Sequence, residues 1–264
     1  MTLKRPNDGN DVQIGAGKFI HYYTPDKLPT MAKHVIFVID ISGSMSGRKL
    51  EQTKDALLSM LDEMKEKNIG ESNMIFHEFK VTSMICTFFI TDSFNILVFS
   101  DNHQTWEVQG DPNLSYSIPN NGGKIFSAID FVLGLNSMGG TNINDAILKA
   151  LEIAKKVKDA EEIGSKTEQL IIFLSDGEPT SGAVTDQTQI KENIRNANNN
   201  TQIPIYGLAF GDGADYDLIK DISDENFAFA KRIYESGNSF EQLENFYKEI
   251  SGTPRKLSLF TQPE

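Results

Sequence analysis

Three oxygen-rich turns in the chain contain the residue types that bind a hard divalent cation. Asp40, Ser42 and Ser44 follow one apolar run, Thr141 lies in a Gly-Gly-Thr turn, and Asp176 follows a second apolar run. Carboxylate and hydroxyl oxygens are the ligands that Mg²⁺ prefers, in an octahedron of six oxygens. Ser42 and Ser44 also have an alternative role, because serine often caps the start of a helix.

The two apolar runs, at residues 35–39 and 170–174, help to decide between these roles. Each is rich in β-branched and aromatic residues and does not alternate, which predicts a strand buried on both faces of a parallel sheet. In an open α/β sheet, the loops at the carboxyl ends of the strands converge on one crevice. The three turns could therefore meet, and the sequence favours a Mg²⁺ site, with Mn²⁺ or Ca²⁺ as alternatives.

Strand and helix patterns alternate along the rest of the chain. Apolar residues at helical spacing predict helices, and uninterrupted apolar runs predict strands. Repeated β-α-β units predict an α/β fold of the doubly wound, Rossmann-like type, a mostly parallel sheet flanked by helices. The expected strands span residues 35–40, 94–99, 105–108, 170–174, 204–210 and 227–233, and the expected helices span 48–65, 125–135, 143–157, 190–197 and 240–250, with one more near 217.

Composition excludes several classes of partner. The 264 residues carry a net charge of −12, with a pI near 4.8. Nucleic acid and anionic membrane surfaces both require a basic face, so neither is an expected partner. The single cysteine, Cys86, cannot form an internal disulfide. The sequence also predicts no membrane span and no signal peptide in this chain, because it contains no apolar segment of the required length.

The pattern Asp40-x-Ser42-x-Ser44, followed by Thr141 and Asp176, resembles the metal-ion-dependent adhesion site of von Willebrand factor type A domains. Longer strings resemble the heavy chains of inter-alpha-trypsin inhibitor, and the resemblance covers about residues 11–251. These strings are FIHYY at 19–23, VIDISGSMSGRK at 38–49, GTNINDA at 140–146 and FYKEI at 246–250.

This resemblance implies a non-catalytic binding module of a secreted, extracellular protein. It implies that the three hydroxyls bind the metal, that Asp40 and Asp176 act through bound waters, and that one metal position stays open. The expected partner is an acidic group on an extracellular protein or matrix component. Association with hyaluronan belongs to the family background, but the C-terminal Asp that heavy chains use for covalent linkage to hyaluronan is not in this chain.

Two other functions remain open. A strand-end Asp could be the nucleophile of a Mg²⁺-dependent phosphoryl-transfer enzyme, although Ser42 stands where a second acid or base would be expected. The domain could also be a structural module whose metal only ties the three loops together. Asn142 and Asp145 have two possible roles as well, because they could orient Thr141 or cap the helix that begins there.

The expected domain organisation is an N-terminal arm at 1–33, the type A domain at 34–251 and a C-terminal tail at 252–264. Residues 70–91 interrupt the resemblance with an apolar, unpatterned segment where heavy chains have a short connection. We interpret them as an insertion or, preferably, a retained intron, because codons for both boundaries can contain splice signals and splicing would keep the frame. Heavy chains carry further domains, so we also expect the chain to be a fragment of a longer protein.

Overall fold

The computed structural model divides the chain into two units, Met1–Met31 and Ala32–Glu264. It describes residues 10–15, 18–23, 33–61, 93–106, 116–117, 123–160, 167–235 and 239–251. The segment at 70–91 and the tail at 252–264, both singled out from the sequence, lie outside the described residues.

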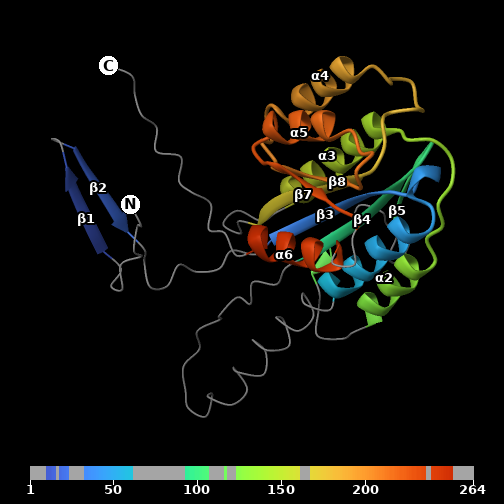
Figure 1. Ribbon diagram of the computed structural model, residues 1–264, viewed down its shortest axis with the longest axis horizontal. Coiled ribbons are helices and arrows are strands. Elements are labelled where there is room, and N and C mark those ends of the chain that lie inside the picture. The colour runs from blue at the N-terminus through green and yellow to red at the C-terminus, as the bar shows by residue number, and fades with distance from the viewer. Residues whose placement is uncertain are drawn as a thin grey trace, which may run out of the picture. The chain divides into compact units, whose positions relative to one another are not determined.

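The first unit contains a two-stranded antiparallel sheet. Strand β1 (Asn10–Gly15) lies beside β2 (Lys18–Tyr23) (Figure 1). The two strands pair with Asn10 opposite Tyr23. The expected N-terminal arm therefore includes regular secondary structure.

A seven-stranded sheet forms the centre of the second unit. Its order is β5-β4-β3-β7-β8-β9, and β6 also pairs with β4. The strands from β4 to β9 along this order are parallel, whereas β5 and β6 run antiparallel to β4. The strands are β3 (Lys33–Asp40), β4 (Ser93–Phe99), β5 (His103–Thr105), β6 (Tyr116–Ser117), β7 (Glu168–Ser175), β8 (Ile205–Phe210) and β9 (Ala230–Ile233).

Helices cover both faces of this sheet (Figure 1). One face packs against α3 (Ile143–Ala160), α4 (Gln187–Asn198) and α5 (Tyr216–Asp224). The other face packs against helical residues 48–61, α2 (Gly123–Leu133) and α6 (Ser239–Ser251). The short 3-10 helix η1 (Gly43–Met45) lies in the loop after β3. This arrangement confirms the expected doubly wound α/β fold.

The side chains of β3 show why its sequence does not alternate. Val35, Phe37 and Ile39 belong to the core on the α2 and α6 side, whereas Ile36 and Val38 belong to the core on the α3 side. Successive side chains of a strand point to opposite faces, and here both faces are covered by helices. An uninterrupted apolar run is therefore required, and this burial places the polar residue Asp40 at the carboxyl end of the strand.

Two strand boundaries differ from the expectation. The predicted edge strand at 105–108 overlaps β5 (His103–Thr105) only at Thr105, and residues 107 and 108 lie outside the described residues. The predicted strand at 227–233 begins only at Ala230, because Phe227 has a φ of 62° and cannot belong to an extended strand.

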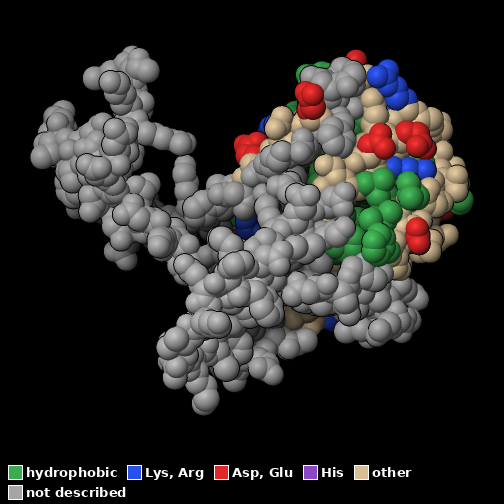
Figure 2. Space-filling model, turned by 90° about the horizontal axis from the view of Figure 1, so that it is seen from below, with side chains coloured by type: hydrophobic (Ala, Val, Ile, Leu, Met, Phe, Trp, Pro, Cys, Tyr) green, Lys and Arg blue, Asp and Glu red, His purple; other side chains and the backbone are tan. Residues whose placement is uncertain are grey.

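Figure 2 shows one face of the molecule, on which hydrophobic side chains gather beside acidic and basic ones. On α2, Phe126 and Leu133 are 60% and 55% exposed.

Among the helices that the structure describes, none has an apolar stretch long enough to cross a membrane.

Candidate metal centre

The three oxygen-rich turns lie at one end of the sheet because of its strand order. The chain passes from β3 to β4 on one side and later returns to the other side of β3 as β7. The loop after β3 therefore leads to one helical layer, and the loop after β7 leads to α4 in the opposite layer. A change of direction of this kind opens a crevice at the carboxyl ends of the strands.

Asp40 is fully buried at the end of β3, and both of its carboxylate oxygens accept hydrogen bonds. The backbone N–H of Ser42 donates to Oδ1 at 2.7 Å, and the Ser175 hydroxyl donates to Oδ2 at 2.5 Å. Burial raises the pKa of Asp40 to about 6, although the hydrogen bonds from Ser175 and Ser42 lower it. A nearby cation would favour the charged form of this carboxylate.

Ser42 and Ser44 form a chain of hydroxyls that ends on Asp176. The two Oγ atoms lie 3.0 Å apart, and the Ser44 hydroxyl donates to Oδ1 of Asp176 at 2.7 Å. Ser42 precedes η1, but its side chain makes no capping hydrogen bond there. Capping therefore does not account for Ser42. Its hydroxyl instead forms a hydrogen bond with the Ser44 hydroxyl, which in turn donates to the Asp176 carboxylate of another loop.

Thr141 reaches the same place from the loop before α3. A Cβ atom added at Gly177 would lie 3.5 Å from both Ser44 Oγ and Thr141 Oγ1, so the two hydroxyls converge on the bare backbone of Gly177. The backbone of Thr141 is held by the adjacent loop, because its N–H donates to Thr180 Oγ1 at 2.9 Å and its carbonyl accepts from the Thr180 N–H at 3.0 Å. The structure thus gathers all five predicted site residues, namely Asp40, Ser42, Ser44, Thr141 and Asp176.

The donor set fits a hard divalent cation. It combines two carboxylates with three neutral hydroxyls, and oxygen ligands of this kind suit Mg²⁺, Mn²⁺ or Ca²⁺. Within the described part of the chain there is no group of three His, Cys, Asp or Glu side chains that could hold a metal ion. A softer site of the zinc-finger type is thus not found there.

A basic side chain, Lys49, already places positive charge at this centre. Its Nζ lies 2.6 Å from Oδ2 of Asp176, whose side chain is fully buried, and 3.5 Å from Oε1 of Glu235. Burial lowers the pKa of Lys49, but hydrogen bonding and charge from Asp176 and Glu235 raise it above its ordinary value. Asp176 and Glu235 therefore stabilise a positive charge at this position, which supports the fit of the site to a divalent cation.

The loop that presents Thr141 depends on two glycines and on Asp101. The Gly140 N–H donates to Asp101 Oδ1 at 2.9 Å. Gly139 has a φ of 70°, and a Cβ atom there would lie 2.3 Å from Asp101 Oδ2. The Gly43 N–H donates to the Gly139 carbonyl at 3.0 Å, which joins this loop to the loop after β3.

Asn142 and Asp145 form a helix cap. The Asp145 N–H donates to Asn142 Oδ1 at 3.3 Å, and Asn142 Nδ2 donates to Asp145 Oδ2 at 2.9 Å. These reciprocal contacts satisfy the start of α3, which supports the capping role of the two considered from the sequence.

Three further residues of this centre, Ser175, Lys49 and Asp101, were not predicted from the sequence. Each had a local signal. Ser175 directly precedes Asp176, and Asp101 follows a buried strand in the same manner as Asp40. Lys49 lies in the first helical turn, where a basic residue is disfavoured by the helix dipole and so indicates a specific anionic partner.

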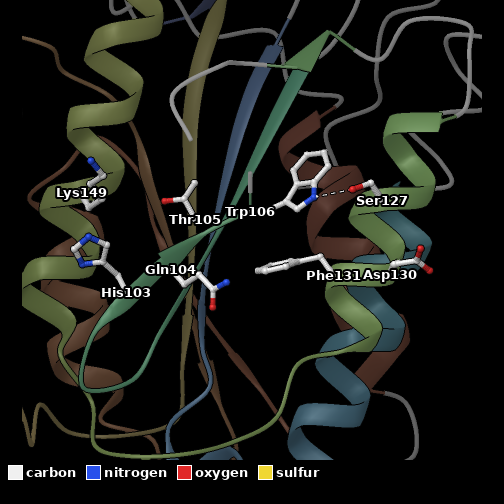
Figure 3. A pocket seen from close by; sticks show the side chains of 8 residues that line it. All are labelled: His103, Gln104, Thr105, Trp106, Ser127, Asp130, Phe131 and Lys149. Carbon is white, nitrogen blue, oxygen red and sulfur yellow. Dashed lines mark hydrogen bonds between the residues drawn. The ribbon is translucent and has the colours of Figure 1, made fainter. Parts of the chain in front are cut away.

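A separate pocket of about 780 Å³ lies at the edge of the sheet (Figure 3). Residues of β5, α2 and α3 line it, and Trp106 Nε1 donates to Ser127 Oγ at 3.4 Å across one wall. None of the five site residues lines this pocket, so the pocket is separate from the candidate metal centre.

Comparison with known proteins agrees with the fold. The family model of the von Willebrand factor type A domain matches residues 34–249. Inter-alpha-trypsin inhibitor heavy chain H3 of Homo sapiens is 35% identical over 94% of this chain, and heavy chain H4 of Bos taurus is 36% identical over 99%. The chain spans only 24% and 25% of these two relatives, about a quarter of their length.

Solved structures show the same fold at low sequence identity. A von Willebrand factor type A protein from Catenulispora acidiphila superposes with a TM-score of 0.59 at 14% identity, covering 88% of this chain and 43% of that one. Proximal thread matrix protein 1 from mussel byssus, with a zinc-occupied adhesion motif, has a TM-score of 0.53 at 14% identity, covering 84% and 47%. The manganese-loaded TRAP protein of Plasmodium vivax has a TM-score of 0.55 at 14% identity, covering 85% and 75%. Because the family model matches residues 34–249, the chain belongs to the von Willebrand factor type A domain family.

Proposed function

We propose that this domain is a non-catalytic binding module that holds a divalent cation, Mg²⁺ in the first instance, at the carboxyl ends of β3 and β7. Through that cation it would bind an acidic group on an extracellular protein or matrix component. The observation that carries the proposal is the convergence of hydroxyls and carboxylates from three loops, with Ser42, Ser44 and Asp176 joined by hydrogen bonds.

The residues of the crevice have distinct parts in this proposal. The hydroxyls of Ser42, Ser44 and Thr141 would bind the cation directly, and Asp40 and Asp176 would hold its water ligands. A cation in this weakly anionic setting would supply an electrophilic position for a partner's carboxylate. Asp40 is already fixed by Ser42 and Ser175, so little ordering would be required when the cation binds.

Two relatives support the choice of a metal. The mussel protein with a zinc-occupied motif and the manganese-loaded Plasmodium protein share the fold of this chain. Similarity to the heavy chains supports an extracellular, secreted setting, since the chain aligns with them over nearly all of its length. The partner remains defined by chemistry alone, as a carboxylate presented on a surface.

The alternative of phosphoryl transfer receives less support. A nucleophilic Asp must reach the substrate, but Asp40 is fully buried and both of its oxygens accept hydrogen bonds from the protein. The neighbouring groups at these oxygens are a serine hydroxyl and a backbone N–H, neither of which is a general acid or base at neutral pH.

Isothermal titration of the purified chain with Mg²⁺ tests the proposal. We expect saturable binding at one site, lost in Ser42→Ala and Thr141→Val and retained in Thr141→Ser, which keeps the hydroxyl. Ser46→Ala is a matched control, because Ser46 lies in the same loop but is exposed. Equal Mg²⁺ affinity in Ser42→Ala, Ser46→Ala and the unmodified chain would contradict the proposed ligand set.

A further inference from the structure

Lys49 lies between two carboxylates that come from different strands. Its Nζ is 2.6 Å from Asp176 Oδ2, after β7, and 3.5 Å from Glu235 Oε1, after β9. The Lys49 side chain is 20% exposed, the Asp176 side chain is fully buried, and the Glu235 side chain is 39% exposed. One ammonium group therefore has a near, buried partner and a second, more solvated partner.

The backbone at Gly211 makes room for the second partner. Gly211 has a φ of 87°, and a Cβ atom there would lie 2.5 Å from Glu235 Oε1 and 3.4 Å from Lys49 Cε. Both side chains thus pack over bare backbone at the end of β8, and the position of Glu235 beside Lys49 is built into the fold.

We propose that Lys49 is a tethered competitor of the divalent cation, which pairs with Asp176 when the metal is absent and shifts to Glu235 when the metal binds. This inference rests on the proposed metal-binding function and concerns the regulation of the same site. It assigns affinity tuning to two residues, Lys49 and Glu235, that are not metal ligands.

Electrostatics supports the competition. Like charges repel each other, and a divalent ion doubles the repulsion that a monovalent ion at the same distance would exert on an ammonium group. The cation would also compete with Lys49 for the carboxylate of Asp176, with which Lys49 forms an ion pair. A shift toward Glu235 relieves both conflicts, because Glu235 is within reach and better solvated.

The test is Mg²⁺ titration of Lys49→Met beside the unmodified chain. We expect the dissociation constant to fall about tenfold, corresponding to 1.4 kcal/mol, because the competing charge is gone. Lys49→Arg keeps the charge and should bind no more tightly than the unmodified chain. Lys191→Met is the matched control, since Lys191 makes a 2.7 Å ion pair with Asp221 between α4 and α5.

Thermal unfolding in EDTA supplies a second readout. Lys49→Met should unfold at a lower temperature than the unmodified chain in EDTA, because Asp176 loses its neutralising partner, and saturating Mg²⁺ should close this gap. A purely structural ion pair would instead lower the unfolding temperature equally with and without Mg²⁺, and that result would overturn the inference.

Glu235→Gln tests the second position of Lys49. We expect this variant to bind Mg²⁺ several-fold more weakly, since Lys49 loses its alternative partner, and we expect no such effect in the Lys49→Met background. If the unmodified chain binds Mg²⁺ and Lys49→Met binds it no more tightly, the role of Lys49 is refuted but the metal-binding function is not. Absence of binding in both chains would refute the metal-binding function itself.

Discussion

His34 is a fully buried titratable side chain at the opposite end of β3 from Asp40. Its Nδ1 lies 2.8 Å from the Ser93 hydroxyl. Burial lowers the pKa of His34 to about 4, although a hydrogen bond with Asn95 raises it. At neutral pH the imidazole is therefore neutral in the fold.

The first prediction concerns the pH dependence of stability. The pKa of His34 falls from 6.5 in the unfolded chain to about 4 in the fold, so the unfolded chain binds a proton first as the pH drops. The stabilisation is complete above pH 6.5, is lost as the pH falls toward 4, and amounts to about 3 kcal/mol.

Denaturant unfolding at pH 7.5, above the unfolded pKa of 6.5, and at pH 4, near the folded pKa, measures this loss. His34→Gln cannot titrate at this position, whereas Asp40 titrates in both chains, so the variant should gain about 3 kcal/mol of unfolding free energy relative to the unmodified chain between pH 7.5 and pH 4. Parallel declines in the two chains would show that His34 is not the source.

Gly139 and Gly47 provide a second prediction at the residue scale. Both have positive φ values, 70° and 73°, but only a Cβ atom at Gly139 collides with Asp101, whereas nothing lies within 4 Å of one at Gly47. Gly47→Ala should cost about 1 kcal/mol of unfolding free energy for its backbone conformation alone. Gly139→Ala should cost about 3 kcal/mol and also weaken Mg²⁺ binding, because Thr141 moves.

Chemical denaturation of both alanine variants, followed by Mg²⁺ titration, measures these effects. Equal losses of stability at the two glycines would show that the contact with Asp101 has no energetic role.

At the scale of secondary-structure elements, Asn198 joins the end of α4 to β8 and α5. Its Oδ1 accepts from the Ile203 N–H at 2.8 Å and from Thr201 Oγ1 at 2.9 Å. Its Nδ2 donates to the Ile203 carbonyl at 2.7 Å and to Asn226 Oδ1 at 3.0 Å. One buried amide therefore satisfies groups from three segments.

The third prediction is that Asn198→Ala lowers the free energy of unfolding by about 3 kcal/mol, because buried partners lose their hydrogen bonds. Asn196→Ala is the control, since Asn196 is exposed on the same helix. It should change stability by less than about 0.5 kcal/mol. Urea titration of the two variants gives both values. Similar losses of unfolding free energy at positions 196 and 198 would contradict the stabilising role of the Asn198 hydrogen bonds.

At the scale of the whole domain, two apolar cores hold the sheet and its two helical layers together. The buried apolar residues of β3, β4 and β7 fill both cores, whereas the metal centre lies at one end of these strands. The net charge of −12 gives the chain a general attraction for cations.

The fourth prediction is that EDTA leaves the far-ultraviolet circular dichroism unchanged, because the cores do not depend on the metal. Mg²⁺ at 100 times its dissociation constant should raise the free energy of unfolding by about 2.7 kcal/mol through mass action. EDTA should also abolish binding of a carboxylate-bearing partner. Loss of helical signal in EDTA would instead favour the structural-metal alternative.

Much of this organisation was predictable from the sequence because it depends on local patterns. The apolar runs of β3 and β7 indicated strands buried on both faces, and the turns after them indicated oxygen ligands. The start of β9 was not predictable, since the apolar sequence continues through Phe227 and only its backbone angle excludes it from the strand.

The sequence by itself determined most of the strand and helix alternation of the second unit, the polar turns at strand ends and the five candidate ligands, but not β1, β2 or β6. Only the tertiary structure decided their partners. Ser175 meets Asp40 across 135 residues, and Lys49 meets Asp176 across 127. These contacts exist because β7 inserts beside β3, and a strand order of this kind is set by the packing of two whole helical layers, which no local pattern encodes.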